Sequence, residues 1–168
     1  MLSTTAEYAL RIMIVLAESE KEPTTSERIA TLTKVPTDYS VKVLQMLARA
    51  GLVRAQRGRG GGFQIDCDPD STTLLDVVNA IDPLERITSC PASRDTHVGQ
   101  LCPLHARLDE IIVLLQDSFR KMTLASVIEG SPGPALCRPD LTSDGQPAAR
   151  HAPATTPAPA TSDGAGAG

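Results

Sequence analysis

The stretch from Leu52 to Asp66, LVRAQRGRGGGFQID, constrains the fold more than any other part of the chain. Apolar and polar residues alternate on either side of the glycine-rich tip: Val53 and Ala55 before it, Phe63 and Ile65 after it. Two short alternating runs joined by such a tip predict a β-hairpin. A glycine-rich loop can also cradle a nucleotide, but this one leads into a strand and not into a helix, which disfavours a phosphate-binding loop.

Three helices are predicted before the hairpin. A dense apolar pattern gives the first, over about 3–19, and Thr25 can cap the second. Pro36 breaks the chain before the third helix, Thr37 can cap it, and Gly51 can end it in a left-handed conformation. Residues at helical spacing form the expected buried faces: Ile29, Ala30 and Leu32 in the second helix, and Val41, Leu44, Leu47 and Ala48 in the third.

Three helices followed by a hairpin form the winged helix-turn-helix arrangement, so the expected fold class is mainly α. The alternative is a generic helical domain that carries a hairpin. A short fourth helix is expected from Thr73 to Ile81, ending at Pro83, then a cysteine-bearing loop over about 88–103 and a long helix over about 103–128. These features divide the chain into a winged domain at 1–83, a loop and dimerisation helix at 84–130, and a tail at 131–168.

The tail at 131–168 differs in composition from the rest of the chain. It holds seven of the thirteen prolines and almost no aliphatic side chains, so it cannot bury enough surface to offset its chain entropy and is predicted to be disordered. The N-terminus has no basic segment typical of a signal peptide, and no apolar run reaches about 18 residues. We therefore expect a cytoplasmic protein with no membrane partner.

The charge distribution indicates a nucleic-acid partner, although the whole chain carries a net charge of −4. Six basic residues and one acid, Asp38, lie between Lys34 and Arg59. A patch of one sign on a single supersecondary unit is typical of phosphate binding. Short polar side chains suit the base edges of the major groove, and arginines at a glycine tip suit the minor groove. The candidate DNA-binding residues are Thr37, Asp38, Tyr39, Ser40, Lys42, Gln45, Arg49, Arg57, Arg59 and Gly60.

The last helix carries a heptad-like seam of apolar residues, interrupted at Ser118: Leu101, Leu104, Leu108, Ile111, Leu115 and Met122. Such a seam could be core in a monomer, but we favour the interface of a homodimer. Two-fold proteins match palindromic operators in double-stranded DNA.

Two cysteines and two histidines lie in the stretch CPASRDTHVGQLCPLH, residues 90–105. Cys102 and His105 are three residues apart at the start of a helix, so both can reach one metal ion, and Cys90 can return to them across the loop. His97 is a fourth candidate ligand. The spacing is a weak zinc signal, and unligated cysteines are the alternative. Cys67 is expected to be ordinary packing, and Cys137 lies in the tail.

Three motifs resemble the Rrf2 family of bacterial transcription regulators: TAEYALRIM, VPTDYSVKVLQMLARAGLVRAQRGRGGGF and LLDVVNAIDP. The resemblance covers about 1–128 and implies a homodimeric winged-helix regulator of transcription, more often a repressor, with no small-molecule substrate. It also implies that the loop before the long helix holds an iron–sulfur cluster, as it does in several members of the family, while other members carry none.

The resemblance places the family's first and third cluster cysteines on Cys90 and Cys102, while Thr96 occupies the place of the middle one. His105 matches a histidine ligand of one branch, and Glu7 matches an acidic ligand that the partner subunit contributes in another. Glu7 can instead be a surface carboxylate or a partner for Arg11. Two thiolates with nitrogen or oxygen donors favour [2Fe–2S] over [4Fe–4S].

The sequence allows three further hypotheses about function. Cys90 and Cys102 can act as a thiol–disulfide switch without a cluster. The chain can be a non-enzymatic metal-binding or scaffold module that uses its wing for protein contacts. An enzyme is disfavoured, because the chain shows no convincing set of nucleophile, base and acid.

Overall fold

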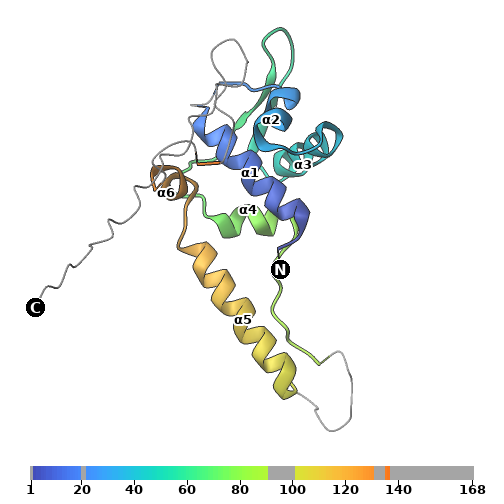
Figure 1. Ribbon diagram of the computed structural model, residues 1–168, viewed down its shortest axis with the longest axis vertical. Helices are drawn as coiled ribbons and strands as arrows, with labels where there is room; N and C mark the ends of the chain where they lie inside the picture. The colour runs from blue at the N-terminus through green and yellow to red at the C-terminus, as the bar shows by residue number, and fades with distance from the viewer. Residues whose placement is uncertain (1, 20–21, 91–100, 131–134, 137–168) are drawn as a thin grey trace, which may run out of the picture. The chain divides into compact units, whose positions relative to one another are not determined.

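The computed structural model describes residues 2–19, 22–90, 101–130 and 135–136 (Figure 1). The described elements are six helices and one two-stranded antiparallel sheet. Three helices precede the hairpin and a fourth follows it, as the sequence predicts. The mainly helical winged helix-turn-helix fold is therefore confirmed. The predicted tail at 131–168 lies outside the described residues except for Ala135 and Leu136, which are half-buried against the core and so depart from the predicted disorder.

The helix α1, Thr4–Glu18, is the centre of the core. Ser3 caps it by accepting a hydrogen bond from the backbone N–H of Ala6 at 3.2 Å. Its side chains Ile12, Met13 and Leu16 are fully buried. The helices α2, α3, α4 and α6 and the strand β2 all pack against α1, so this helix organises the winged domain.

The helix α2, Ser26–Thr33, begins as predicted with Thr25, whose side chain accepts from the backbone N–H of Arg28. Ile29 and Ala30 are buried, whereas Leu32 is only half-buried. The helix ends at Lys34, which adopts a left-handed conformation with φ of 59°. This short left-handed link leads directly into the turn before α3.

The helix α3, Thr37–Arg49, corrects two predictions. Pro36 and not Thr37 occupies the capping position, and no side chain caps this helix, because the helical conformation already includes Thr37. Ser40 was predicted on the exposed face but is fully buried. It shares the inner face with Val43, Leu44 and Leu47, and this set follows the helical spacing i, i+3, i+4, i+7. The expected end is confirmed, since Gly51 has φ of +76°.

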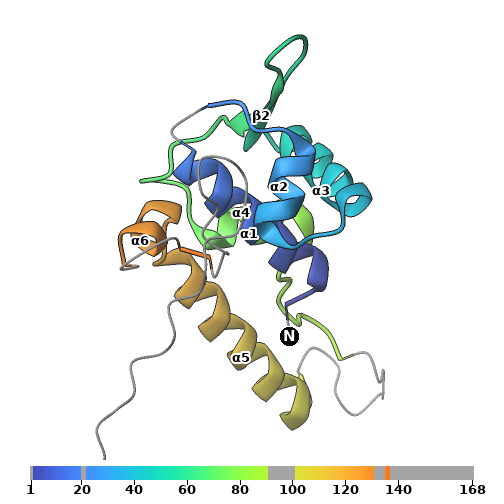
Figure 2. The same cartoon turned by 45° about the horizontal axis from the view of Figure 1, so that its top comes forward.

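The strands β1, Val53–Gln56, and β2, Gly62–Ile65, form the predicted hairpin, which projects from the helices (Figure 2). Val53 lies opposite Ile65. Only its base is buried, and the tip is exposed. Thr24 pairs with Phe63 through two backbone hydrogen bonds of 2.8 Å, which add a bridge beside β2. Gly62 is required there, since a Cβ atom would lie 2.6 Å from the carbonyl oxygen of Thr24.

The helix α4, Leu74–Ile81, starts at a capping box in which Thr73 and Asp76 satisfy each other's backbone N–H groups. The predicted single helix over 103–128 is wrong: α5 covers Pro103–Arg120 and a separate α6 covers Leu124–Glu129. The chain turns between them because Thr123 caps α6 and forms a bridge with Thr73. Met122 consequently lies outside α5 and does not continue its seam.

The helix α5 packs chiefly against α4 and leaves one side uncovered. Within the described part of the chain, every large apolar side chain that stays exposed belongs to α5: Leu104, Leu108, Ile111 and Leu114. These positions recur every three or four residues and form a stripe along the helix. None of the helices in the described ranges has the length and hydropathy needed to cross a membrane.

Candidate functional site

The candidate DNA-binding residues lie on two adjacent elements, because β1 packs against α3. Eight of the ten are exposed on the N-terminal half of α3, its outer face or the hairpin tip: Thr37, Asp38, Lys42, Gln45, Arg49, Arg57, Arg59 and Gly60. An exposed helix face beside a projecting hairpin can offer polar side chains to a groove and cations to the flanking phosphates.

The cations of this surface are mostly unpaired. Arg54 lies 3.8 Å from Asp66 in a loose ion pair, but no ion pair among the described residues involves Lys34, Lys42, Arg49, Arg57 or Arg59. A solvated protein surface usually mixes charges into pairs. Cations that are in no ion pair instead leave their charge available for an anionic partner.

Two of the ten candidates have structural contacts. Ser40 is buried, as described above, and Tyr39 is half-buried against α1. The Tyr39 hydroxyl shares a hydrogen bond of 2.6 Å with Thr5, and its ring meets the ring of Tyr8 edge-on at 5.6 Å. The ammonium group of Lys42 lies 5.7 Å from the Tyr39 ring centroid. Tyr39 therefore fixes the N-terminal turn of α3 against α1 and orients Lys42.

Glu7 pairs with Arg11 one turn later on α1, and Arg11 also donates to the backbone carbonyl of Thr33 at 3.3 Å. The pairing with Arg11 that the sequence left open is thus present. Glu7 does not join the cysteines within one protomer, because the group with metal-ligand geometry in the described residues contains only Cys90, Cys102 and His105. A role for Glu7 as a ligand from a second protomer remains a prediction.

Cys90, Cys102 and His105 meet at the first turn of α5. The Nδ1 atom of His105 lies 3.0 Å from the sulfur of Cys102 and 3.5 Å from the sulfur of Cys90. All three ligand atoms lie within 4.8 Å of one another, and the three residues are half-buried. The sequence thus identified the residues that come together. Thr96 and His97 lie outside the described residues.

This donor set fits a thiophilic metal. A tetrahedral ion about 2.3 Å from sulfur and about 2.0 Å from nitrogen holds those two atoms about 3.5 Å apart. The observed separations of 3.5 and 3.0 Å are close to that value. Two thiols and one imidazole leave at least one coordination position open, which suits either a fourth ligand or an iron–sulfur cluster with mixed ligands.

The thiols of Cys102 and Cys67 differ in acidity. The pKa of Cys102 is lowered to about 7, because the backbone N–H of His105 at the start of α5 stabilises the thiolate, and the His105 ring and Cys90 thiol add to this. Burial raises the pKa of Cys67, which is half-buried beside the core. Of these two thiols Cys102 is therefore the more reactive, whereas Cys67 packs beside the core as predicted. Cys137 lies outside the described residues.

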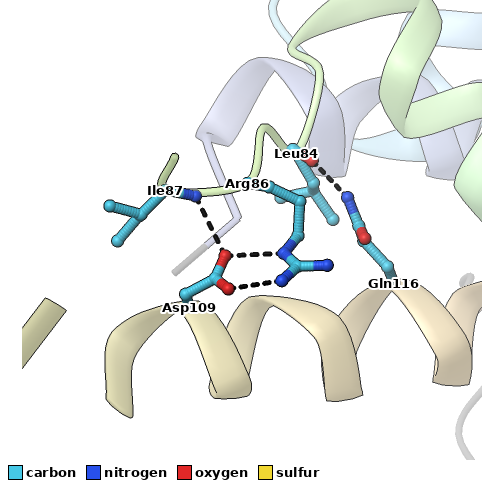
Figure 3. A network of polar contacts seen from close by, with 5 residues as sticks. All are labelled: Leu84, Arg86, Ile87, Asp109 and Gln116. Carbon is cyan, nitrogen blue, oxygen red and sulfur yellow. Dashed lines mark hydrogen bonds and ion pairs between the residues drawn. The ribbon is translucent and has the colours of Figure 1, made fainter. Parts of the chain in front are cut away.

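A polar network behind the cysteines was not predicted from the sequence. Asp109 of α5 accepts hydrogen bonds from Arg86 and from the backbone N–H of Ile87, and Gln116 donates to the carbonyl oxygen of Leu84 (Figure 3). Asp109 is four residues after His105 and Gln116 eleven, so helical periodicity would have placed all three on one face. Nothing local could have identified Arg86 as the partner, 23 residues away.

Comparison with known proteins gives a consistent picture. A relative from Aquifex aeolicus (strain VF5), named as an HTH-type transcriptional regulator, is 27% identical over 129 residues, or 75% of this chain and 90% of that protein. The structure of CymR (YrzC), the global cysteine regulator of B. subtilis, aligns with a TM-score of 0.64 at 24% identity, covering 78% of this chain and 98% of CymR.

IscR from T. potens aligns with a TM-score of 0.63 at 19% identity, covering 77% of this chain and 87% of IscR. At these identities, the two structural matches establish the fold. The family is established by the sequence, since residues 2–130 match the model of the Rrf2 family, described as iron-dependent transcriptional regulators. This chain therefore belongs to the Rrf2 family, whose members regulate transcription and are not enzymes.

Proposed function

We propose that the protein is a cytoplasmic, homodimeric repressor that binds a palindromic operator and whose affinity for DNA depends on an iron–sulfur cluster. In this proposal, residues 1–83 bind DNA, and 84–130 hold the cluster and the dimer interface. The observation that carries the cluster assignment is the convergence of Cys90, Cys102 and His105 on one point at the start of α5. The site lies at one end of α5, the helix that also carries the exposed apolar stripe, so the proposed cluster and the proposed dimer interface share one helix.

DNA recognition is assigned to the outer face of α3 and to the hairpin. Gln45 is exposed in the middle of α3 and suits a bidentate contact to adenine, while Lys42 suits guanine or a phosphate. Arg57 and Arg59 on the hairpin tip suit the phosphates or a narrow minor groove. Asp109 and the cysteines play no part in this contact.

The dimer is assigned to the stripe on α5. Leu104, Ile111 and Leu114 are 63%, 59% and 67% exposed, and a helix that leaves such side chains in water gains free energy by pairing. A second copy of the same stripe is the proposed occupant, because heptad-like spacing makes a helix complementary to itself. Two-fold pairing also presents two copies of α3 to the two halves of a palindrome.

The cluster is assigned to Cys90, Cys102 and His105, with Glu7 of a second protomer as the fourth candidate. When bound, such a group supplies one-electron chemistry, and its iron–sulfur bonds are open to attack by oxidants and nitric oxide. The mixed donors favour a [2Fe–2S] centre over an all-thiolate [4Fe–4S] one. His105 contributes Nδ1, and the lowered pKa of Cys102 keeps a large share of that thiol ionised at neutral pH, as ligation requires.

A second candidate function is a thiol switch without a cluster. It is favoured by the acidity of Cys102 and by the position of Cys90, whose sulfur lies within 4.8 Å of it. A thiolate next to a second thiol can form a disulfide after oxidation. Both candidates place the signal at the start of α5, and they differ in whether the isolated protein contains iron.

The cluster is tested by anaerobic purification of the full chain followed by iron and sulfide analysis and a visible spectrum. We expect iron, acid-labile sulfide and a charge-transfer spectrum that Cys90→Ala, Cys102→Ala and His105→Ala each weaken or abolish. Cys67→Ala is the matched control and should leave the spectrum unchanged. A colourless wild-type protein without iron would refute the cluster and leave the thiol switch.

The DNA surface is tested by the salt dependence of binding to a duplex. Each cation that contacts a phosphate contributes about 0.9 to the slope of log K against log salt concentration. Replacing both Arg57 and Arg59 by Ala should reduce that slope by about 2 for each bound protomer. The matched control is Arg120→Ala with Lys121→Ala, which removes two exposed cations at the end of α5. Equal slopes for the two double variants would exclude the hairpin from the interface.

A further inference from the structure

The segment that joins α4 to Cys90 is fastened along one face of α5 (Figure 3). Both carboxylate oxygens of Asp109 accept from the guanidinium group of Arg86, with the Nε contact at 2.6 Å. The Oδ1 atom also accepts from the backbone N–H of Ile87 at 3.0 Å. Two turns further along α5, Gln116 donates to the carbonyl oxygen of Leu84. We call the contacts of Asp109 with Arg86 and Ile87 the Asp109 clamp.

The clamp is built around a buried charge. Asp109 is 8% exposed and is the only acidic residue in the buried set of the described chain. Burying a carboxylate is costly unless it is paired and hydrogen-bonded, and three donors satisfy this one. The hydrogen bonds from Arg86, followed by the one from Ile87, hold the pKa of Asp109 below its ordinary value, so the clamp stays charged at neutral pH.

The register of the clamp places it directly behind the cysteine site. On α5, Asp109 is one turn after His105 and on the same face. On the opposite segment, Ile87 is three residues before Cys90, and three residues of chain span at most about 10 Å. Once the backbone at Ile87 is fixed to Asp109, Cys90 is confined to within about 10 Å of that point, which includes the first turn of α5. Its sulfur is found 3.5 Å from the His105 Nδ1 atom.

We propose that Asp109 is a positioning residue, which through Arg86 and the Ile87 amide holds the Cys90 thiol beside Cys102 and His105. Cys102 immediately precedes α5 and His105 lies in its first turn, so neither needs the clamp, whereas Cys90 comes from outside the helix and does. Loss of the clamp should therefore remove one thiol from the site and leave the other two ligands in place. The inference deepens the proposed function, since its metal-binding consequence rests on that function.

The first test uses Co²⁺ as a spectroscopic probe of the apo, reduced, full-length protein. Thiolate-to-cobalt charge-transfer absorbance reports the number of bound thiolates, which a merely structural role would not change. We expect Asp109→Asn to weaken Co²⁺ binding by about 10- to 100-fold and to reduce this absorbance to that of Cys90→Ala. Asp117→Asn is the matched control: it is the same substitution on the same helix and breaks the exposed Asp117–Arg120 pair.

The second test does not involve metal. In a Cys67→Ala, Cys137→Ala background, the reduced protein reacts with oxidised glutathione to give the Cys90–Cys102 disulfide and two molecules of reduced glutathione. The equilibrium constant measures the effective concentration of one thiol at the other. We expect Asp109→Asn to lower it by about tenfold or more, because it frees the Cys90 segment, and Asp117→Asn to leave it unchanged.

The outcomes separate the inference from the proposed function. A wild-type protein that binds neither iron nor cobalt would refute the metal site, and the glutathione equilibrium would still test the clamp. Asp109→Asn behaving like Asp117→Asn in both assays would overturn the inference. If Asp109→Asn fails to fold, judged by circular dichroism, Arg86→Lys takes its place: it keeps the charge but loses the two-pronged contact, and it should give a smaller loss of the same sign.

Discussion

The proposed dimer makes a quantitative prediction for Ile111→Ser. Ile111 is 59% exposed on the apolar stripe of α5. Complete burial of an isoleucine side chain is worth about 1.5–3 kcal/mol, so covering the exposed part contributes about 1–2 kcal/mol. A two-fold interface contains the residue twice, which gives about 2–4 kcal/mol for each dimer. Since 1.4 kcal/mol is a factor of ten, the dimer dissociation constant should rise by about 30- to 1,000-fold.

The dissociation constant is measured by sedimentation velocity over a range of protein concentrations, under reducing conditions so that no disulfide links two chains. Glu110→Ser, next to Ile111 on the same helix, changes an exposed polar residue and should leave the constant nearly unchanged. Thermal unfolding of the isolated monomer should hardly change, because Ile111 is already exposed there. The reasoning would be refuted by equal dissociation constants for the two variants, or by a wild-type protein that stays monomeric.

Three further predictions concern single side chains. Alkylation of Cys102 in the apo protein by iodoacetamide should be half-maximal near pH 7 and fall below it, since its pKa is lowered to about 7, whereas Cys67 should react only at higher pH; peptide mass spectrometry separates the two. Tyr39→Phe removes the hydrogen bond to Thr5 and should lower the free energy of unfolding by about 1 kcal/mol, measured by urea titration. Thr73→Val removes the capping box of α4 and should cost about 0.5–2 kcal/mol in the same titration, with an unchanged denaturant slope.

The helices and the hairpin were predictable because their signals are local. Thr25 caps α2, Gly51 ends α3 in a left-handed conformation, and the glycine tip marks the hairpin. The buried face of α3 was harder to predict. The predicted face included Val41 and Ala48 and was shifted by one position, so Ser40, which is buried, was assigned to the exposed face. A small hydroxyl side chain fits against the core, and binary patterning cannot show that.

The break between α5 and α6 and the Asp109 clamp were not predictable, because both depend on contacts between distant parts of the chain. The turn at 121–123 exists because Thr123 pairs with Thr73, fifty residues earlier. In the same way, an aspartate in the middle of an amphipathic helix is usually solvated, and only the path of the segment after α4 shows that Asp109 is buried. The cysteine site itself could be predicted from the sequence, because Cys102 and His105 are only three residues apart.

The attachment of α5 at both ends of α4 has a mechanical consequence. At one end of α4, backbone hydrogen bonds join Leu74 to Met122 and Leu124 to Thr72, where the chain continues just after α5; at the other end, Gln116 of α5 donates to the carbonyl oxygen of Leu84 just beyond α4. The 18 residues of α5, roughly 27 Å of helix, therefore contact the rest of the fold chiefly through one short helix that also contacts α1 and α3. The candidate ligands Cys90, Cys102 and His105 lie at the opposite end of α5 and do not belong to the core, so a change in this donor set would leave the packing of the core unchanged.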